Sequence, residues 1–249
     1  EYNQPVWSLM LPRLRNSFIL SFFSILFTWL AAIPIGIFCA VKQYSFMDKV
    51  FSFFSFVGMA VPGFFFALLL LYVVSLTYDL PADHALYGIL PLGGMTGADF
   101  AQLSLLGKIA DIARHLVLPV IVLGMGGTAG LQRLMRGNML ETLRQDYITL
   151  ARAKGLPEHK VIYKHAVRNA VNPLVTIFGY TLPAFLSGAA LVEIIFGYPG
   201  IGMMMLTAVR SHDLFLVMGN LMLGAFLLIT GNLIADILLA VVDPRIEYR

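Results

Sequence analysis

The stretch DYITLARAKGLPEHKVIYKHAVRNAVNP, Asp146 to Pro173, is a polar, basic island between segments apolar enough to cross a bilayer. Between Arg133 and Arg168 the chain carries eight Lys or Arg residues against three acids. Gly155 is placed to act as a left-handed helix cap, and Pro157 suits the first turn of a second helix. The pattern therefore predicts a helix, a glycine turn and a second helix, which form a charged hairpin on one side of a membrane protein.

The composition of the whole chain sets the class of protein. Hydrophobic residues make up 59% of the 249 residues and charged residues only 12%, with a mean hydropathy of +0.81. A soluble domain has about 25% charged residues. The apolar runs are continuous rather than alternating, which predicts spanning helices and not a barrel. We therefore expect an all-α integral membrane protein, in which the single Cys39 serves packing.

Five segments are long enough to supply the roughly 20 apolar residues that a membrane span needs. These predicted spans are 17–41, 50–77, 115–131, 171–196 and 214–242. Each contains Gly or Pro, which we interpret as kinks or packing faces, because neighbouring helices can satisfy the freed backbone groups. We expect one membrane domain over 1–249, because no internal repeat or low-complexity linker divides the chain.

The charges of the connecting segments predict the orientation, since Lys and Arg in short loops favour the cytoplasm. The basic segments 42–49, 133–168 and 243–249 would all lie on one side, whereas 78–114 holds four acids against two basic residues. This predicts an N-terminus outside and a C-terminus in the cytoplasm, although two arginines before the first span oppose it. An outside N-terminus that begins with Glu rather than Met predicts a further preceding span, with a cleaved signal peptide as the alternative.

Each of the two predicted helices of the hairpin has an amphipathic pattern. Tyr147, Leu150, Ala151 and Lys154 share one face of the first helix, and Glu158 is favourable at the positive end of the second. The second helix carries one stripe at a spacing of 3.6 residues, made of Val161, Ile162, His165, Ala166, Asn169 and Ala170. Two interpretations stay open at this point: an interfacial hairpin that follows the charge bias, and a docking element for a cytosolic partner.

Several motifs resemble those of ABC importer permeases of the dipeptide, oligopeptide and nickel branch. In the hairpin they are Asp146-Tyr147, the run Ala151 to Leu156, His165-Ala166, and Arg168-Asn169-Ala170 with Pro173. Beyond it they are Ala60 to Phe64, Glu193 to Phe196, the run Tyr198-Pro199-Gly200-Ile201-Gly202, Asn232 with Asp236, and Asp243-Pro244-Arg245. One departure is that the general signature opens with Glu-Ala-Ala where this chain has Thr149-Leu150-Ala151, so no glutamate role is assigned at position 149.

The resemblance implies a type I ABC importer permease fold, with six spans in the full subunit, in a bacterial cytoplasmic (inner) membrane. It implies a channel-forming subunit for peptides or a related small solute, beside a second similar permease subunit, two cytosolic ATP-binding subunits and an extracytoplasmic substrate-binding protein. A cytoplasmic coupling helix would lie within the loop 133–170. The implied coupling residues are Tyr147, Ala151, Arg152, Ala153, Lys154, Gly155, Leu156, His165, Arg168 and Asn169. The implied outer gate or turn consists of Glu193, Tyr198, Pro199, Gly200 and Gly202.

Other chemistry finds little support in the sequence. No GxxxxGK[ST] phosphate-binding loop occurs, so ATP and Mg are expected on separate subunits and no catalytic, cofactor or metal site on this chain. Nucleic-acid binding is not expected, because the basic residues are interleaved with a membrane-anchored stripe. An ion-gradient-driven secondary transporter or channel is the alternative function, but it would favour buried relays and an inverted repeat. Glu193 could contact substrate or anchor the turn that follows it. Asp236 could form a structural ion pair, act at a helix end or contact substrate.

Overall fold

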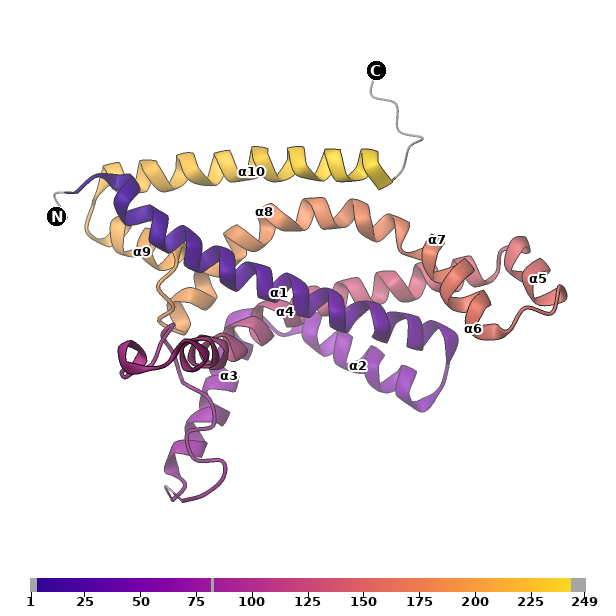
Figure 1. Ribbon diagram of the computed structural model, residues 1–249, viewed down its shortest axis with the longest axis horizontal. Helices are drawn as coiled ribbons and strands as arrows, with labels where there is room; N and C mark the ends of the chain where they lie inside the picture. Colours follow the sequence, from indigo (N-terminus) through magenta and orange to yellow (C-terminus); the bar gives the residue numbers. More distant parts are fainter. Residues whose placement is uncertain (1–3, 82, 243–249) are drawn as a thin grey trace. The chain divides into compact units, whose positions relative to one another are not determined.

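The computed structural model describes residues 4–81 and 83–242, with the backbone alone at 175–176, 179–188, 235–236 and 238–242. The predicted roles of the Asp236 side chain and of Asp243-Pro244-Arg245 therefore lie outside the described residues. Figure 1 shows the helices in chain order. They are α1 (Val6–Val41), α2 (Phe46–Ala60), α3 (Gly63–Ser75), η1 (Leu76–Asp79), η2 (Phe100–Gln102), α4 (Leu105–Leu143), α5 (Asp146–Ala153), α6 (Glu158–Lys160), the π-helical turn η3 (Val161–Val167), α7 (Arg168–Ala170), α8 (Asn172–Ile195), α9 (Ile201–Arg210) and α10 (Leu214–Val242).

The all-helical membrane class is confirmed over the described residues. α1, α4 and the segment Leu214–Ile234 of α10 are each long and apolar enough to cross a membrane. α2 and α3 together would supply a further span, as a broken span or a re-entrant loop. The count of five spans stays a prediction.

Two of the predicted spans were wrong in their extent. The segment 50–77 is not one helix, because α2 ends at Ala60 and α3 begins at Gly63 after Pro62. Proline has no N–H to donate and disfavours helical backbone at the residue before it. The span predicted at 115–131 belongs to α4, which continues to Leu143 through Gly137 because most of the following residues are good helix formers and Met135 and Met139 pack into a buried core. Arg133 and Arg136 thus lie on a helix and not in a loop.

The chain clusters into two compact units, which are described separately. The first unit comprises 1–27, 61–124 and 184–227, and the second comprises 28–60, 125–183 and 228–249. Three apolar clusters stabilise the first unit. One joins α3, α4 and α8, another joins α1, α9 and α10, and the third joins α1, α4 and α8 around Tyr198. A single larger cluster stabilises the second unit, where Met135 and Met139 of α4 pack against residues of α1 and of the hairpin.

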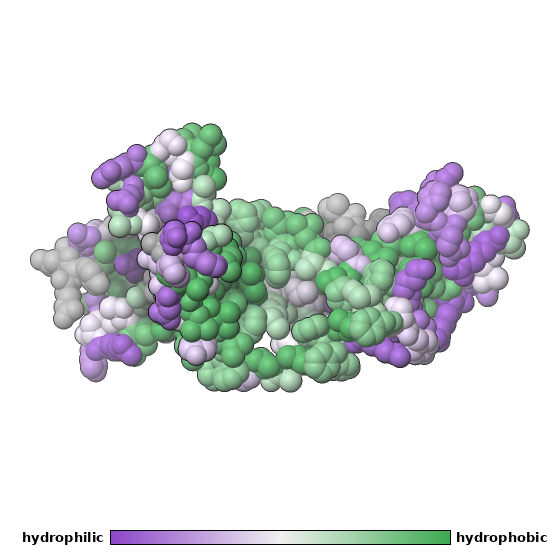
Figure 2. Space-filling model, turned by 90° about the horizontal axis from the view of Figure 1, so that it is seen from below, coloured by the Kyte–Doolittle hydropathy of each residue, from purple (hydrophilic) through white to green (hydrophobic). Residues whose placement is uncertain are grey.

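Large hydrophobic side chains are exposed along several helices. Phe53, Phe54 and Phe56 of α2 are examples, as are Phe226 and Ile229 of α10. Figure 2 shows apolar surface of this kind in green. A soluble monomer rarely exposes such extended apolar surface, whereas the bilayer covers it in a membrane protein.

Candidate functional site

The hairpin predicted from the sequence forms around a Schellman turn at the end of α5. The N–H of Leu156 donates to the carbonyl of Ala151 at 3.3 Å, and the N–H of Gly155 donates to that of Arg152 at 2.9 Å. Gly155 has a φ of +76°, so the left-handed cap predicted there is present. An added Cβ at Gly155 would meet no atom within 4 Å. Glycine is therefore favoured here by backbone conformation and not by space.

An ion pair joins the two arms of the hairpin across this turn. Arg152 Nη2 lies 2.7 Å from Glu158 Oε1, and Arg152 Nε lies 3.2 Å from Oε2. Hydrogen bonding to Arg152 lowers the pKa of the Glu158 carboxyl, and the same contact raises the pKa of Arg152. Both side chains are exposed, so the pair adds little stability, and its two parallel bonds mainly fix the angle between α5 and α6.

The predicted face of α5 divides between core and surface. Ala151 is buried beside Ile148 in the core of the second unit. Tyr147 and Leu150 point outward instead, with 43% and 55% of their surfaces exposed. Arg152, Ala153, Lys154 and Leu156 are exposed as well. Tyr147 and Ala151 lie one helical turn apart, as predicted, but they differ in burial, because Ala151 packs inward while Tyr147 remains accessible.

The second arm is not a regular α-helix. Residues Val161–Val167 form a π-helical turn between α6 and α7. Val161, Ile162, Ala166 and Ala170 of the predicted stripe are buried, whereas His165 is half-buried and Asn169 and Arg168 are exposed. The wider π turn displaces the stripe from its 3.6-residue spacing, so Asn169 faces outward and donates to the carbonyl of His165 at 2.8 Å.

The end of α4 supports the hairpin from inside the second unit. Met135 and Met139 are fully buried in the same cluster as Ile148 and Val161. Asn138 Nδ2 donates to the carbonyl of Ala170 at 3.2 Å. Figure 2 shows hydrophilic residues gathered at the right, where Figure 1 places α5 and α6. The hairpin is thus a polar, outward-facing surface fixed on a rigid apolar base.

A second predicted set of residues forms a turn in the first unit, which we call the Glu193 turn (residues 193–202). The N–H of Tyr198 donates to the carbonyl of Glu193 at 2.8 Å, and the N–H of Gly197 donates to that of Ile194 at 3.3 Å. Gly197 has a φ of +58°. α8 therefore ends in the same backbone motif as α5.

The Glu193 carboxylate binds the N-terminus of α9. Only 1% of Glu193 is exposed, and its Oε2 accepts from the N–H groups of Gly202 at 2.7 Å and Met203 at 3.3 Å. Its Oε1 accepts from Ser17 Oγ at 2.5 Å, and Ser17 Oγ in turn accepts from the N–H of Ile201 at 2.8 Å. A negative group is favourable at a helix N-terminus. This geometry favours the anchoring alternative for Glu193.

The two later glycines of the motif are explained by close packing. A Cβ at Gly200 would collide with the Glu193 carboxylate, and a Cβ at Gly202 would collide with Ala190 of α8. Both glycines are therefore required by the approach of α8 to the start of α9. Glu193, Gly200 and Gly202 therefore act together as one structural unit.

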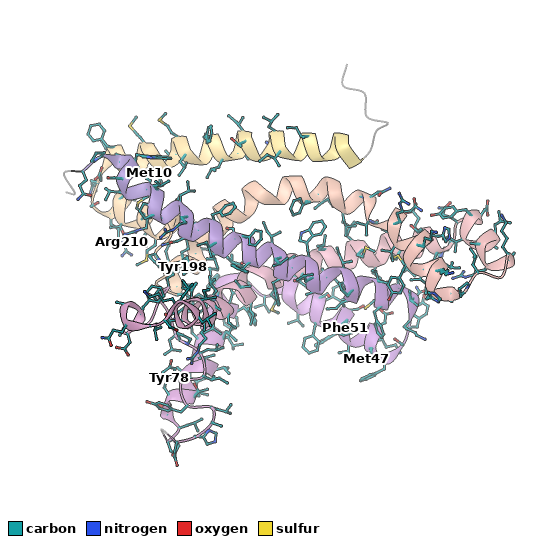
Figure 3. All side chains as sticks on the ribbon, in the orientation of Figure 1. Met10, Met47, Phe51, Tyr78, Tyr198 and Arg210 are labelled. Atoms are coloured by element: carbon teal, nitrogen blue, oxygen red, sulfur yellow. The ribbon has the colours of Figure 1, made fainter. Side chains whose placement is uncertain are left out.

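Tyr198 and Pro199 connect this turn to α1. Tyr198 is fully buried, and Figure 3 labels it at the turn after α8. Its hydroxyl donates to the carbonyl of Asn16 at 3.1 Å, while Asn16 Nδ2 donates to the carbonyl of Pro199 at 2.9 Å. Burial raises the pKa of Tyr198 well above its usual range, aided by the Glu193 charge, so the hydroxyl remains a donor. Asn16 and Ser17 were not identified from the sequence as partners of this turn. The pattern that could have indicated them is two adjacent polar residues within an apolar helix.

No group of three or more His, Cys, Asp or Glu is placed to hold a metal ion among the residues that the structure describes. Cys39 is a free, buried cysteine. The expectation that this chain holds no cofactor stays a prediction.

The described residues thus combine apolar helices that could cross a membrane with an outward-facing charged hairpin. Residues 32–248 match the family described as "Binding-protein-dependent transport system inner membrane component". The oligopeptide transport system permease protein AppB of Bacillus subtilis is 41% identical over 98% of this chain and 73% of its own length. The dipeptide transport system permease protein DppB of Escherichia coli is 36% identical over 98% and 74%. The chain belongs to this family, and it is a multi-pass inner-membrane protein.

The fold agrees with a solved transporter structure. The MetNI methionine ABC transporter in an inward-facing conformation matches with a TM-score of 0.70 over 97% of this chain and 99% of that one, at 15% identity. The type I permease fold and the function of an importer permease subunit, both expected from the motifs, are confirmed. The ion-gradient alternative is not supported. Which residues couple or gate stays a prediction.

Proposed function

We propose that this chain forms half of the path by which an ATP-driven importer moves peptides across the cytoplasmic membrane. The names of its relatives support peptides as the solute class, since AppB and DppB are oligopeptide and dipeptide permeases. The other half of the path is a second, similar permease subunit. A substrate-binding protein delivers the solute on the outer side, where the N-terminus lies, and the C-terminus lies in the cytoplasm.

The hairpin couples this chain to a cytosolic ATP-binding subunit, one of two that bind ATP and Mg. The observation that carries this role is the exposure of Tyr147 and Leu150 on a hairpin that also exposes Arg152, Lys154 and Leu156. Large apolar side chains amid cations suit a groove on a protein, because interface centres combine aromatic, aliphatic and Arg side chains. His165, Arg168 and Asn169 would border the contact, while Gly155 sets its angle and Ala151 holds it from beneath.

The Glu193 turn acts on the outer side as a fixed joint of the gate. Its contacts with Asn16 and Ser17 join the ends of α8 and α9 to α1. A joint whose side chains Asn16, Ser17, Glu193 and Tyr198 are all buried transmits motion between helices without changing its own shape. We assign the turn this mechanical role rather than contact with the solute.

Reconstitution of the full assembly in vesicles tests the proposed function. We expect uptake of labelled dipeptides or oligopeptides that requires ATP and the ATP-binding subunits, and that persists with an uncoupler present. Uptake driven by an ion gradient without those subunits would overturn the proposal. Nickel uptake in place of peptide uptake would overturn the solute class alone.

Labelling of an introduced thiol tests the orientation. A Lys154→Cys variant should react with a membrane-impermeant maleimide only from the cytoplasmic side. The native Cys39 is buried, so its background reaction should be low. Reaction of Cys at 154 from the outside of intact cells would overturn the coupling role.

A further inference from the structure

An ion pair joins α2 to α4 in the second unit, between the buried Asp48 and the partly exposed Arg136. Arg136 Nε lies 3.0 Å from Asp48 Oδ1, and Arg136 Nη2 lies 3.0 Å from Oδ2. Asp48 is only 3% exposed. The sequence reading placed these two residues in separate basic segments and missed the pair. A bidentate arginine–carboxylate contact fixes both distance and angle between the helices.

Asp48 is itself held rigidly at the start of α2. Its N–H donates to Ser45 Oγ at 3.2 Å, and its Oδ2 accepts from the N–H of Tyr44 at 2.8 Å. Ser45 thus caps the N–H of Asp48 at the start of the helix, and the Asp48 carboxylate accepts from the N–H of Tyr44, one residue before this cap. Arg136 therefore contacts a carboxylate whose orientation is fixed by these hydrogen bonds.

Two more contacts continue the junction along α2. Ser55 Oγ donates to Gln132 Oε1 at 2.6 Å. Arg133 Nη1 lies 3.3 Å from Met59 Sδ, and its guanidinium lies 4.9 Å from the centre of the Phe56 ring. Figure 3 labels Met47 and Phe51, which mark the first turns of the same helix. Polar contacts thus tie α2 to α4 from its first turn to its last.

The same segment of α4 carries the base of the hairpin. Met135 and Met139 pack into the hairpin core, and Asn138 binds the carbonyl of Ala170. Residues 132–139 thus face α2 on one side and the hairpin on the other. Any displacement of the hairpin base acts on this segment first.

We infer that Asp48 and Arg136 are positioning residues that make α2 move with α4 and the hairpin as one body during transport. The inference rests on the proposed coupling role of the hairpin. Separating the pair would leave the buried Asp48 carboxylate without its cationic partner, which is costly. The pair therefore persists while the assembly changes state, and the motion passes to the end of α2.

Charge-removing variants provide the first test. In reconstituted vesicles, Arg136→Gln and Asp48→Asn should each lower the peptide taken up per ATP hydrolysed by at least about tenfold, while ATP hydrolysis remains. Asp48→Asn keeps an acceptor for the N–H of Tyr44, so it spares the cap. The double variant should lose no more than either single variant, because both remove the same contact. The matched control is Lys49→Gln, since Lys49 is the exposed neighbour of Asp48 and its loss should leave the ratio unchanged.

A tether provides the second test, which does not depend on the charged variants assembling. Ser55→Cys with Gln132→Cys, in a Cys39→Ala background, is cross-linked with a short thiol-reactive reagent. If α2 and α4 move as one body, uptake by the tethered protein should stay within about twofold of the untethered protein. Loss of uptake on tethering would overturn the inference. It would also be overturned if both single charge variants took up as much peptide per ATP hydrolysed as the unmodified protein. Absence of ATP-dependent uptake in the unmodified assembly would instead overturn the proposed function.

Discussion

The turns at Gly155 and Gly197 share one backbone geometry but differ in everything around it. Each ends a helix with the same pair of hydrogen bonds, and the glycines have φ values of +76° and +58°. At Gly155 the surrounding side chains are exposed and a single exposed ion pair crosses the turn. At Gly197 the neighbouring Glu193 and Tyr198 are buried and bind groups on α1 and α9.

The difference separates two uses of one local motif. Around Gly155 the turn sets the direction of an accessible surface, so substitutions there should change docking more than folding. Around Gly197 the turn holds three helices together, so substitutions there should change folding first. Four variants test this contrast, in order of their expected effect on the free energy of unfolding.

Removal of the Glu193 carboxylate should cause the largest loss. Glu193→Ala removes the acceptor of the half-buried N–H groups of Gly202 and Met203 and of the buried Ser17 hydroxyl, which should together cost about 3 kcal/mol. Thermal unfolding of the purified protein in detergent measures the change. Glu193→Gln keeps an acceptor oxygen and should lose less. Equal stability of Glu193→Ala and the unmodified protein would refute the anchoring role.

Filling the close approach at Gly202 should come second. Gly202→Ala places a methyl group against Ala190 of α8, and such overpacking should cost about 2 kcal/mol. The control is Gly137→Ala on α4, where an added Cβ meets nothing within 4 Å. That control should unfold at the same temperature or slightly higher. A Gly202 variant as stable as the control would show that the turn is not tightly packed.

Replacing Gly155 should have a smaller effect on folding and a larger one on coupling. Gly155→Val forces a β-branched residue toward positive φ and should cost about 1–2 kcal/mol of local strain. The protein should remain in the membrane and keep its assembly, but uptake per ATP should fall because α5 points elsewhere. Gly155→Asn tolerates the left-handed region and should retain most uptake. Unchanged uptake by the Val variant would contradict the role of the hairpin.

The Arg152–Glu158 ion pair should have the smallest effect. Both side chains are exposed, so Glu158→Gln should change stability by at most about 0.5 kcal/mol. Because the folded-state pKa of Glu158 is lowered, the contribution of the pair is present at neutral pH and is lost as the pH falls through that lowered value. The stability difference between the Gln variant and the unmodified protein should therefore vanish in acid. A difference that grows in acid would contradict this assignment.

Features set by local sequence could be predicted, and features set by distant partners could not. The Gly155 cap and the bounds 214–242 of the last apolar helix follow from neighbouring residues, and both agree with the structure. The motifs also led to the correct family. The outward turn of Asn169 was missed because a π turn changes the helical periodicity. The continuation of α4 was missed because the packing of Met135 and Met139 extends the helix beyond the apolar run.

The partners of Glu193 and Arg136 lie far away in the sequence. Ser17 and Asp48 are separated from them by 176 and 88 residues, and no spacing rule connects such positions. Glu193 could be selected from the sequence as an acid near the end of a span. Whether it anchors the turn or contacts substrate could not be predicted, because this depends on which N–H groups lie beside its carboxylate. Asp48 gave no signal, because a single acid in a short basic link has an ordinary composition.

The length of α4 has a consequence for how the membrane itself affects docking. At 1.5 Å per residue, its 39 residues give a contour length of about 58 Å, against a hydrocarbon thickness of about 30 Å. We therefore expect its last turns, with the hairpin packed against them, to extend beyond the hydrocarbon core as a stalk. A soluble partner can meet the hairpin without touching lipid, so we expect its affinity to depend little on headgroup composition. Bilayer thickness would instead act on the tilt of the stalk.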